Sequence, residues 1–69
     1  MKTFFSKGQH VMIYQDPLTE KKREGMAELC EFNCSYYDIE IWKVRFIGEE
    51  RFVQRNISVK GKNKPKGQL

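Results

Sequence analysis

The fold is decided at Trp42-Lys43-Val44-Arg45-Phe46, where large apolar side chains alternate with basic ones. A period of two is typical of a strand with one buried face, because successive side chains of a strand point to opposite sides. We therefore predict a half-buried strand here, with Trp42, Val44 and Phe46 in the core and Lys43 and Arg45 toward solvent.

The residues that follow this strand predict a hairpin and one further strand. Gly48-Glu49 is a tight-turn signal, after which residues 51–53 return as the partner strand of the hairpin. We interpret residues 54–56 as a one-turn connector and residues 57–59 as the strand that closes the sheet.

Two more strands are predicted on the N-terminal side. Residues 11–14 form a short apolar run rich in β-branched and aromatic residues, which favours a strand. Residues 26–32 place Ala27 and Leu29 on an inward face, while the acid at Glu31 interrupts the alternation and indicates a bulge.

The connections between these strands are polar. Residues 16–25 are interpreted as a long charged loop, which leaves open whether they contain a helical turn, and residues 33–38 as a turn-rich connection. Five short strands of this kind predict an all-β fold, a small five-stranded barrel over residues 1–59. Curling into a barrel removes the exposed edges that a flat sheet would leave.

The net charge of +4 is located at the C-terminal end. Residues 1–59 carry nine basic and nine acidic side chains, whereas residues 60–69 add four lysines and no acid. Glycine, asparagine and proline between these lysines cannot bury enough apolar surface to offset chain entropy. We expect a folded domain over residues 1–59 and a flexible, disordered lysine-rich tail over residues 60–69.

The order of these segments resembles a Src-homology-3-like barrel, from about Gly8 to Val59. The resemblance implies a brief helical turn between the last two strands. Signalling modules of that fold bind proline-rich peptides with an exposed tryptophan at the head of the third strand, where this chain has Ile41. More loosely, the chain looks like short uncharacterised barrel proteins of phages and mobile elements, a similarity that carries no known activity. The segments that carry this looser likeness are residues 11–19, Glu24-Gly25 and residues 42–46.

Basic side chains gather on or beside the late hairpin and continue into the tail. Such a face, extended by lysines, is typical of non-specific phosphate binding. The alternative interpretation is that the hairpin cations pair with Glu40, Glu49 and Glu50 across the same hairpin. The candidate nucleic-acid residues are Lys43, Arg45, Arg51, Arg55, Lys60, Lys62, Lys64 and Lys66.

Three tyrosines that flank loops, Tyr14, Tyr36 and Tyr37, are candidates for an aromatic groove. Tyrosine offers a large contact area at low conformational cost, which favours a role in binding. The alternative is that these rings cover the barrel end. Tudor-like relatives of the barrel use an aromatic cage, for which Phe32 would be a fourth ring.

Metal binding and catalysis find little support in the sequence. Cys30, Cys34 and His10 supply three soft ligands where structural zinc needs four, so we expect two reduced thiols and no metal. His10 has no adjacent nucleophile signature, and no glycine-rich phosphate loop occurs. We predict no catalytic residue, no cofactor, no small-molecule substrate, no membrane segment and a cytoplasmic location.

These observations predict a small, non-enzymatic binding module. In the first interpretation it binds nucleic acid or nucleoprotein without sequence specificity, through the basic hairpin face and the lysine tail. In the alternative it is a protein–protein interaction adaptor that uses the aromatic groove at the barrel loops. The low charge of residues 1–59 favours the second interpretation, whereas the lysine tail and the basic hairpin favour the first.

Overall fold

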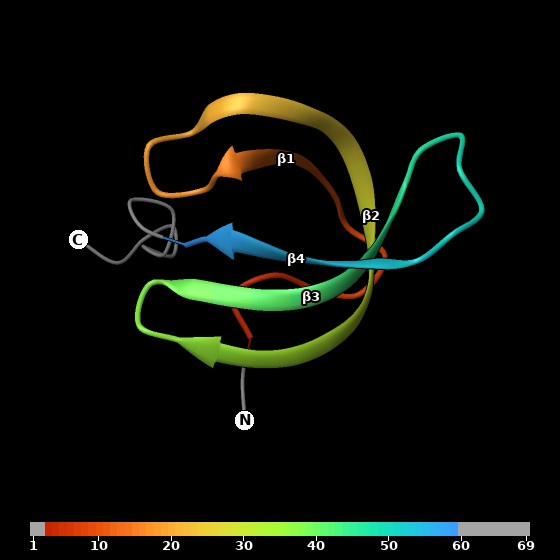
Figure 1. The fold of residues 1–69 in the computed structure, drawn as a ribbon. Coiled ribbons are helices and arrows are strands. Elements are labelled where there is room, and N and C mark those ends of the chain that lie inside the picture. Colours follow the sequence, from red (N-terminus) through yellow and green to blue (C-terminus); the bar gives the residue numbers. More distant parts are fainter. Residues whose placement is uncertain (1–2, 60–69) are drawn as a thin grey trace, which may run out of the picture.

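Residues 3–59, which the computed structural model describes, form one antiparallel sheet of four strands in sequence order (Figure 1). The strands are β1 (His10–Asp16), β2 (Lys21–Tyr36), β3 (Ile39–Phe46) and β4 (Val53–Ser58). The predicted all-β class is therefore confirmed. The sheet curls into a half-barrel with β1 and β4 at its two edges. The predicted tail, residues 60–69, lies outside the described residues.

The length of β2 explains the curl. A flat strand of 16 residues would extend about 50 Å, whereas the longest dimension of the described molecule is 39 Å. The register of β2 against β3 shifts between Leu29 and Glu31 and again between Phe32 and Cys34. The bulge predicted near Glu31 is thus confirmed, and the extra residue is Cys30, beside Glu31. Because bulges increase the local bend and twist, β2 pairs with β1 along its first half and with β3 along its second.

Gly25 lies in the first half of β2 with an unusual backbone conformation. It adopts φ of +141°, a conformation that other residues rarely occupy. A Cβ built there would lie 3.6 Å from Cδ1 of Phe46. The ring of Phe46 lies over the backbone of β2 at this position, and a Cβ there would meet it at ordinary van der Waals distance, so the positive φ is what favours glycine.

The core lies inside the curl and follows the predicted parity. Trp42 is 2% exposed and Val44 is fully buried, although Phe46 is only half-buried at the end of β3. Ala27 and Leu29 contribute from β2, as expected. The buried apolar side chains are Phe5, Ile13, Ala27, Leu29, Trp42, Val44, Ile57 and Val59.

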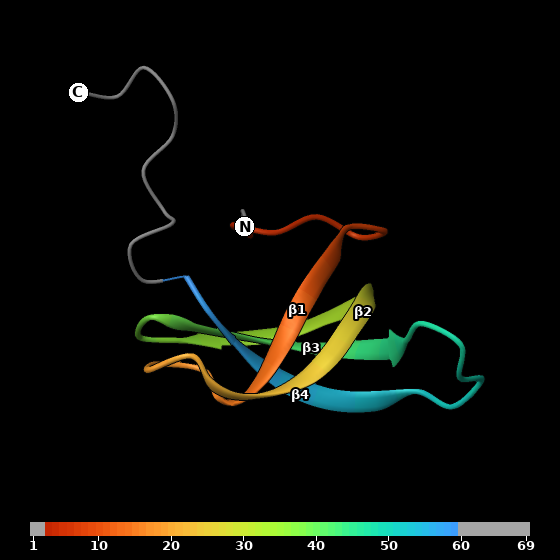
Figure 2. The ribbon, with the colours of Figure 1, turned by 90° about the horizontal axis from the view of Figure 1, so that it is seen from above.

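A segment outside the sheet completes this core. Residues 3–9, which we call the N-terminal strap, bring Phe5 into the core with only 5% of its surface exposed. Figure 2 shows the strap turning sharply before it enters β1. In the turn, the Gln9 amide donates to the Ser6 carbonyl at 3.1 Å, and Gly8 has φ of +90°. No strand or turn pattern in the sequence predicted that the strap packs into the core.

The predicted connector at residues 54–56 is wrong, because β4 runs unbroken through it. The register pairs Val53 with Val44 and Ser58 with Ile39, so these residues belong to one continuous ladder. Their polar side chains suggested a turn, but an edge strand tolerates polar residues on its exposed face. The described residues therefore form four strands where five were predicted.

The loops are also shorter than predicted. β2 already begins at Lys21, so the loop predicted at residues 16–25 reduces to a turn at residues 17–20 that contains no helix. β2 likewise extends through most of residues 33–38. The loop after β3 is instead longer than predicted, because the partner strand, predicted at residues 51–53, begins only at Val53. Backbone hydrogen bonds can continue a strand through charged residues whose side chains all face water. Such a segment has no alternation of apolar and polar residues, so its sequence does not predict a strand.

Candidate functional site

The basic residues of β3 are held in ion pairs by acids of β2. Lys43 Nζ lies 3.2 Å from Glu31 Oε1, and Arg45 Nη2 lies 2.9 Å from Glu28 Oε1. Each pair stands directly opposite in the β2–β3 register, the arrangement in which cross-strand charges interact. The pairing interpretation predicted other partners, and among residues 3–59 no side-chain ion pair joins these cations to Glu40, Glu49 or Glu50.

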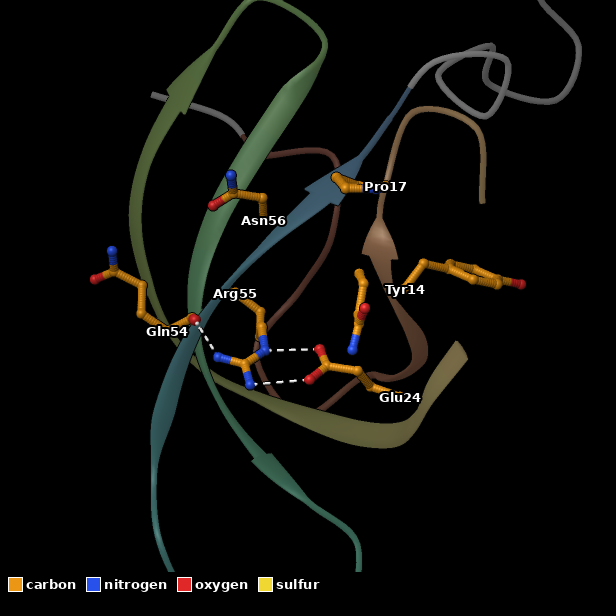
Figure 3. Close-up of a pocket in the computed structure, with 7 residues that line it drawn as sticks. Tyr14, Pro17, Glu24, Gln54, Arg55 and Asn56 are labelled. Carbon is orange, nitrogen blue, oxygen red and sulfur yellow. Dashed lines mark hydrogen bonds and ion pairs between the residues drawn. The ribbon is translucent and has the colours of Figure 1, made fainter. Parts of the chain in front are cut away.

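Arg55 makes a bidentate pair with Glu24 across the gap between β4 and β2 (Figure 3). Its Nε donates to Glu24 Oε1 at 2.8 Å and its Nη2 to Glu24 Oε2 at 3.0 Å. The guanidinium also lies 5.6 Å from the ring centroid of Phe46. Hydrogen bonding to the Glu24 carboxylate raises the pKa of Arg55. A fork-to-fork pair of this kind fixes both side chains and compensates the charge of Arg55.

Arg51 is the remaining hairpin candidate, and among residues 3–59 it makes no ion pair. It lines a groove with Met26 and Ile47, both of which are exposed. Phe52 beside it is also exposed, and Lys43 Nζ lies 6.0 Å from its ring centroid. The hairpin that was predicted to be a basic face is therefore mixed, with compensated cations and exposed apolar side chains.

A run of three basic residues lies at the start of β2, within residues 16–25, which were predicted to be a loop. Lys21, Lys22 and Arg23 are all exposed, and Lys22 adopts φ of +61°. The sequence shows these three cations as consecutive residues. Because they were predicted to lie in a loop, their position on a strand was not expected. Lys21 stands opposite Asp16 in the β1–β2 register, which offsets part of this charge.

Tyr36 and Tyr37 form an exposed ring pair at the β2–β3 turn. Their ring centroids are 4.5 Å apart at 70°, and the residues are 64% and 88% exposed. Tyr37 adopts φ of +56°, which is strained for an aromatic residue. These rings are exposed to solvent, and the predicted alternative of a buried cover for the barrel end does not fit their exposure.

The end of the described chain is fixed beside this ring pair. The Val59 amide donates to the carbonyl of Asp38, the residue after Tyr37, at 2.8 Å. Figures 1 and 2 both show the β1–β2 turn, the β2–β3 turn and the end of β4 at one end of the molecule, which we call the turn end. The predicted lysines at 60, 62, 64 and 66 lie outside the described residues, and the chain leads into them from Val59.

Tyr14 lies apart from that pair, in an open groove between the facing edges of β1 and β4. This seam groove has a volume of about 340 Å³ and none of the Tyr36–Tyr37 pair among its lining residues. A more apolar groove of about 380 Å³ adjoins it, between the strap, β1 and Ile57, and also contains Tyr14. The seam groove is lined by Tyr14, Gln15, Pro17, Glu24, Gln54, Arg55 and Asn56.

The described residues offer no evident metal site. Within residues 3–59, no group of three or more histidine, cysteine or acidic side chains is placed to hold an ion. Cys30 and Cys34 are free thiols. The same part of the chain contains no helix long and apolar enough to cross a membrane.

Comparisons with protein-family models, curated proteins and solved structures gave no significant match to this chain.

Proposed function

We propose that this chain is a small, non-enzymatic module that binds nucleic acid without sequence specificity, at the turn end. The observation that carries the proposal is the hydrogen bond between Val59 and Asp38. It holds Val59, the last described residue before the lysine-rich residues 60–69, against the turn that carries the exposed Tyr36 and Tyr37. A surface for base stacking and a segment for phosphate binding would thus start from the same turn.

The tyrosine pair and the lysine-rich residues 60–69 would contact different parts of a nucleic acid, the bases and the phosphates. Exposed aromatic rings stack on unpaired bases of any sequence, with about 1–3 kcal/mol per base. The basic run at Lys21, Lys22 and Arg23 lies at the same end, but Asp16, Glu20 and Asp38 balance its charge. The positive excess available for phosphate therefore comes from the four lysines of residues 60–69. The paired cations Lys43, Arg45 and Arg55 would contribute only by exchanging partners.

The proposal includes a Src-homology-3-like barrel as the fold and the cytoplasm as the location. A curled antiparallel sheet with a long, bent second strand is compatible with a Src-homology-3-like barrel, an architecture that many small binding modules use. Free cysteines suit a reducing compartment, which supports a cytoplasmic location.

A salt titration with a single-stranded oligonucleotide tests the proposal. Deleting residues 60–69 removes four lysines and takes the net charge from +4 to zero. Each phosphate contact contributes about 0.7 to the slope of log affinity against log salt on a single strand, so the slope should fall by up to about 2.8.

The ring pair is tested in the same assay by Tyr36→Thr with Tyr37→Asn, because asparagine tolerates the positive φ at position 37. This variant should weaken binding at every salt concentration, with an unchanged slope. Phe52→Thr, which removes an exposed ring from the hairpin at the opposite end, is the matched control and should bind as the parent does. Absence of binding by the full chain at low salt would refute the proposal.

The seam groove favours a second candidate, a protein-interaction adaptor. Facing edge strands with an open groove between them can accept an extended peptide, as in other cases of strand addition. Such binding would depend little on salt and would survive deletion of residues 60–69. Those two responses separate the adaptor from the nucleic-acid module.

A further inference from the structure

The Tyr36–Tyr37 pair is carried on a turn that hydrogen bonds hold on both sides. Tyr36 stands opposite Ile39 in the β2–β3 register, so the two strands are paired up to the base of the turn. The Val59 amide donates to the Asp38 carbonyl at 2.8 Å, which ties the turn to the end of β4. The two rings are therefore preorganised, and a ligand that binds them has little backbone to order.

Tyr37 is the more exposed ring of the pair, and its backbone is strained. It is 88% exposed, and Tyr36 packs edge-on against it with the ring centroids 4.5 Å apart. The φ of +56° costs a residue with a Cβ roughly tenfold in equilibrium constant, and a ring this exposed recovers little of that by packing. Strained conformations of this kind cluster at functional sites. The exposure and the strain together point to Tyr37 as a recognition residue.

The described part of the turn end has no excess of positive charge. Its three cations are matched in number by three acids. These residues are Lys21, Lys22 and Arg23 against Asp16, Glu20 and Asp38. A duplex carries one charge per about 1.7 Å of its axis, which is twice the density of a single strand, so the four lysines of residues 60–69 would by themselves favour a duplex. Any preference for a single strand must therefore come from the rings.

Exposed rings can stack on the bases of a single strand more readily than on those of a duplex. Bases inside a duplex are covered by their neighbours and are reached only by unstacking them, whereas unpaired bases offer free faces. We propose that Tyr37, supported by Tyr36, makes the turn end selective for single-stranded over duplex nucleic acid. This inference rests on the proposed nucleic-acid function and adds its substrate class. One stacked base contributes roughly 5- to 140-fold in affinity, which an intact duplex does not gain.

The affinities of the full chain for two probes measure this selectivity. One probe is a fluorescent oligothymidylate, which forms no internal base pairs. The other is a relaxed closed-circular DNA duplex, which exposes no terminal base pair and is added as a competitor. Tyr37→Asn removes the ring and tolerates the positive φ. It should lower the ratio of single-strand to duplex affinity by roughly 5- to 140-fold at every salt concentration, through weaker binding of the single strand.

Two further variants and a melting curve serve as controls. Tyr37→Phe keeps a ring at the same position and should retain the preference of the parent for the single strand. Phe52→Thr removes an exposed ring from the opposite end of the molecule and should leave the affinity ratio unchanged. Tyr37→Asn should melt no lower than the parent, because asparagine adopts a positive φ more readily than tyrosine does.

The outcomes distinguish this inference from the proposed function. Binding of neither probe at low salt would exclude nucleic-acid binding itself and the selectivity with it. If both probes bind and Tyr37→Asn leaves their affinity ratio unchanged, nucleic-acid binding stands and the selectivity assigned to Tyr37 is wrong. A lower melting temperature for Tyr37→Asn would also overturn the assignment, because the ring would then serve the fold.

Discussion

Trp42 combines two roles that a single substitution can separate. Its ring is buried and packs edge-on against Phe32, with centroids 5.5 Å apart, while its Nε1 donates to Glu40. Trp42→Ala should lower the free energy of unfolding by about 3–5 kcal/mol, because it leaves a cavity in a small core. Trp42→Phe keeps an aromatic ring and removes the donor, and should cost about 1–3 kcal/mol. Urea unfolding measures both.

The difference in unfolding free energy between Trp42→Phe and the parent measures the contribution of the hydrogen bond to Glu40. A Trp42→Phe chain as stable as the parent would show that the hydrogen bond to Glu40 contributes nothing. Native tryptophan emission of the parent should be that of a buried indole.

Asp16 provides a prediction about acid pH. The pKa of its carboxyl is lowered from the ordinary value of 3.8, chiefly by a hydrogen bond from the Thr19 side chain and then by one from the Thr19 amide. Because the folded-state pKa lies below the unfolded one, this interaction stabilises the fold above pH 3.8 and is lost as pH falls through the folded value. Thr19→Ala should raise the pKa of Asp16 toward 3.8 in a carbon-detected NMR titration. Thr19→Ser, which keeps the hydroxyl, should leave it low, and equal shifts in both variants would contradict the assignment.

At the scale of elements, ion pairs of different exposure join the strands. Arg55 and Glu24 tie β4 to the first half of β2, whereas Lys43 and Glu31 join neighbouring strands at a more exposed site. In double-mutant cycles the bidentate Arg55–Glu24 pair should couple by about 1 kcal/mol, and the Lys43–Glu31 pair by roughly 0–0.5 kcal/mol. Thermal or urea unfolding of the single and double alanine variants measures both couplings.

The Arg55–Glu24 coupling should also weaken with added salt, since part of it is exposed. Equal coupling in the two cycles would mean that the bidentate geometry in Figure 3 adds no stability.

At the scale of the whole molecule, the charge excess lies outside the part of the chain that the structure describes. Within residues 3–59 the buried core extends from Phe5 to Val59, whereas the four lysines without acidic counterparts belong to residues 60–69. Deleting residues 60–69 should therefore leave the melting temperature within about 2 °C of the parent, since surface changes usually alter stability by less than about 0.5 kcal/mol. Calorimetry checks this, and a larger drop would show that the segment contributes to the fold.

Local patterns in the sequence determined the all-β class, the parity of β3 and the position of the charge excess. Trp42 and Val44 are buried because alternation along a strand is a property of neighbouring residues alone. The bulge near Glu31 could be predicted because it interrupts the same local alternation. For the candidate site, the sequence supplied the tyrosines and the lysines as separate features.

Only the tertiary structure decided which of these features meet. The curl of β2 brings Glu24 to Arg55, and the β2–β3 register places Glu28 and Glu31 opposite β3. The burial of Phe5 and the hydrogen bond from its amide to Glu40 depend on contacts about 35 residues apart, which no local period encodes. The Val59–Asp38 bond likewise joins the lysine-rich segment to the tyrosine turn through the pairing of β3 with β4. Composition and periodicity report what each residue prefers, whereas its partner is set by how the whole sheet bends.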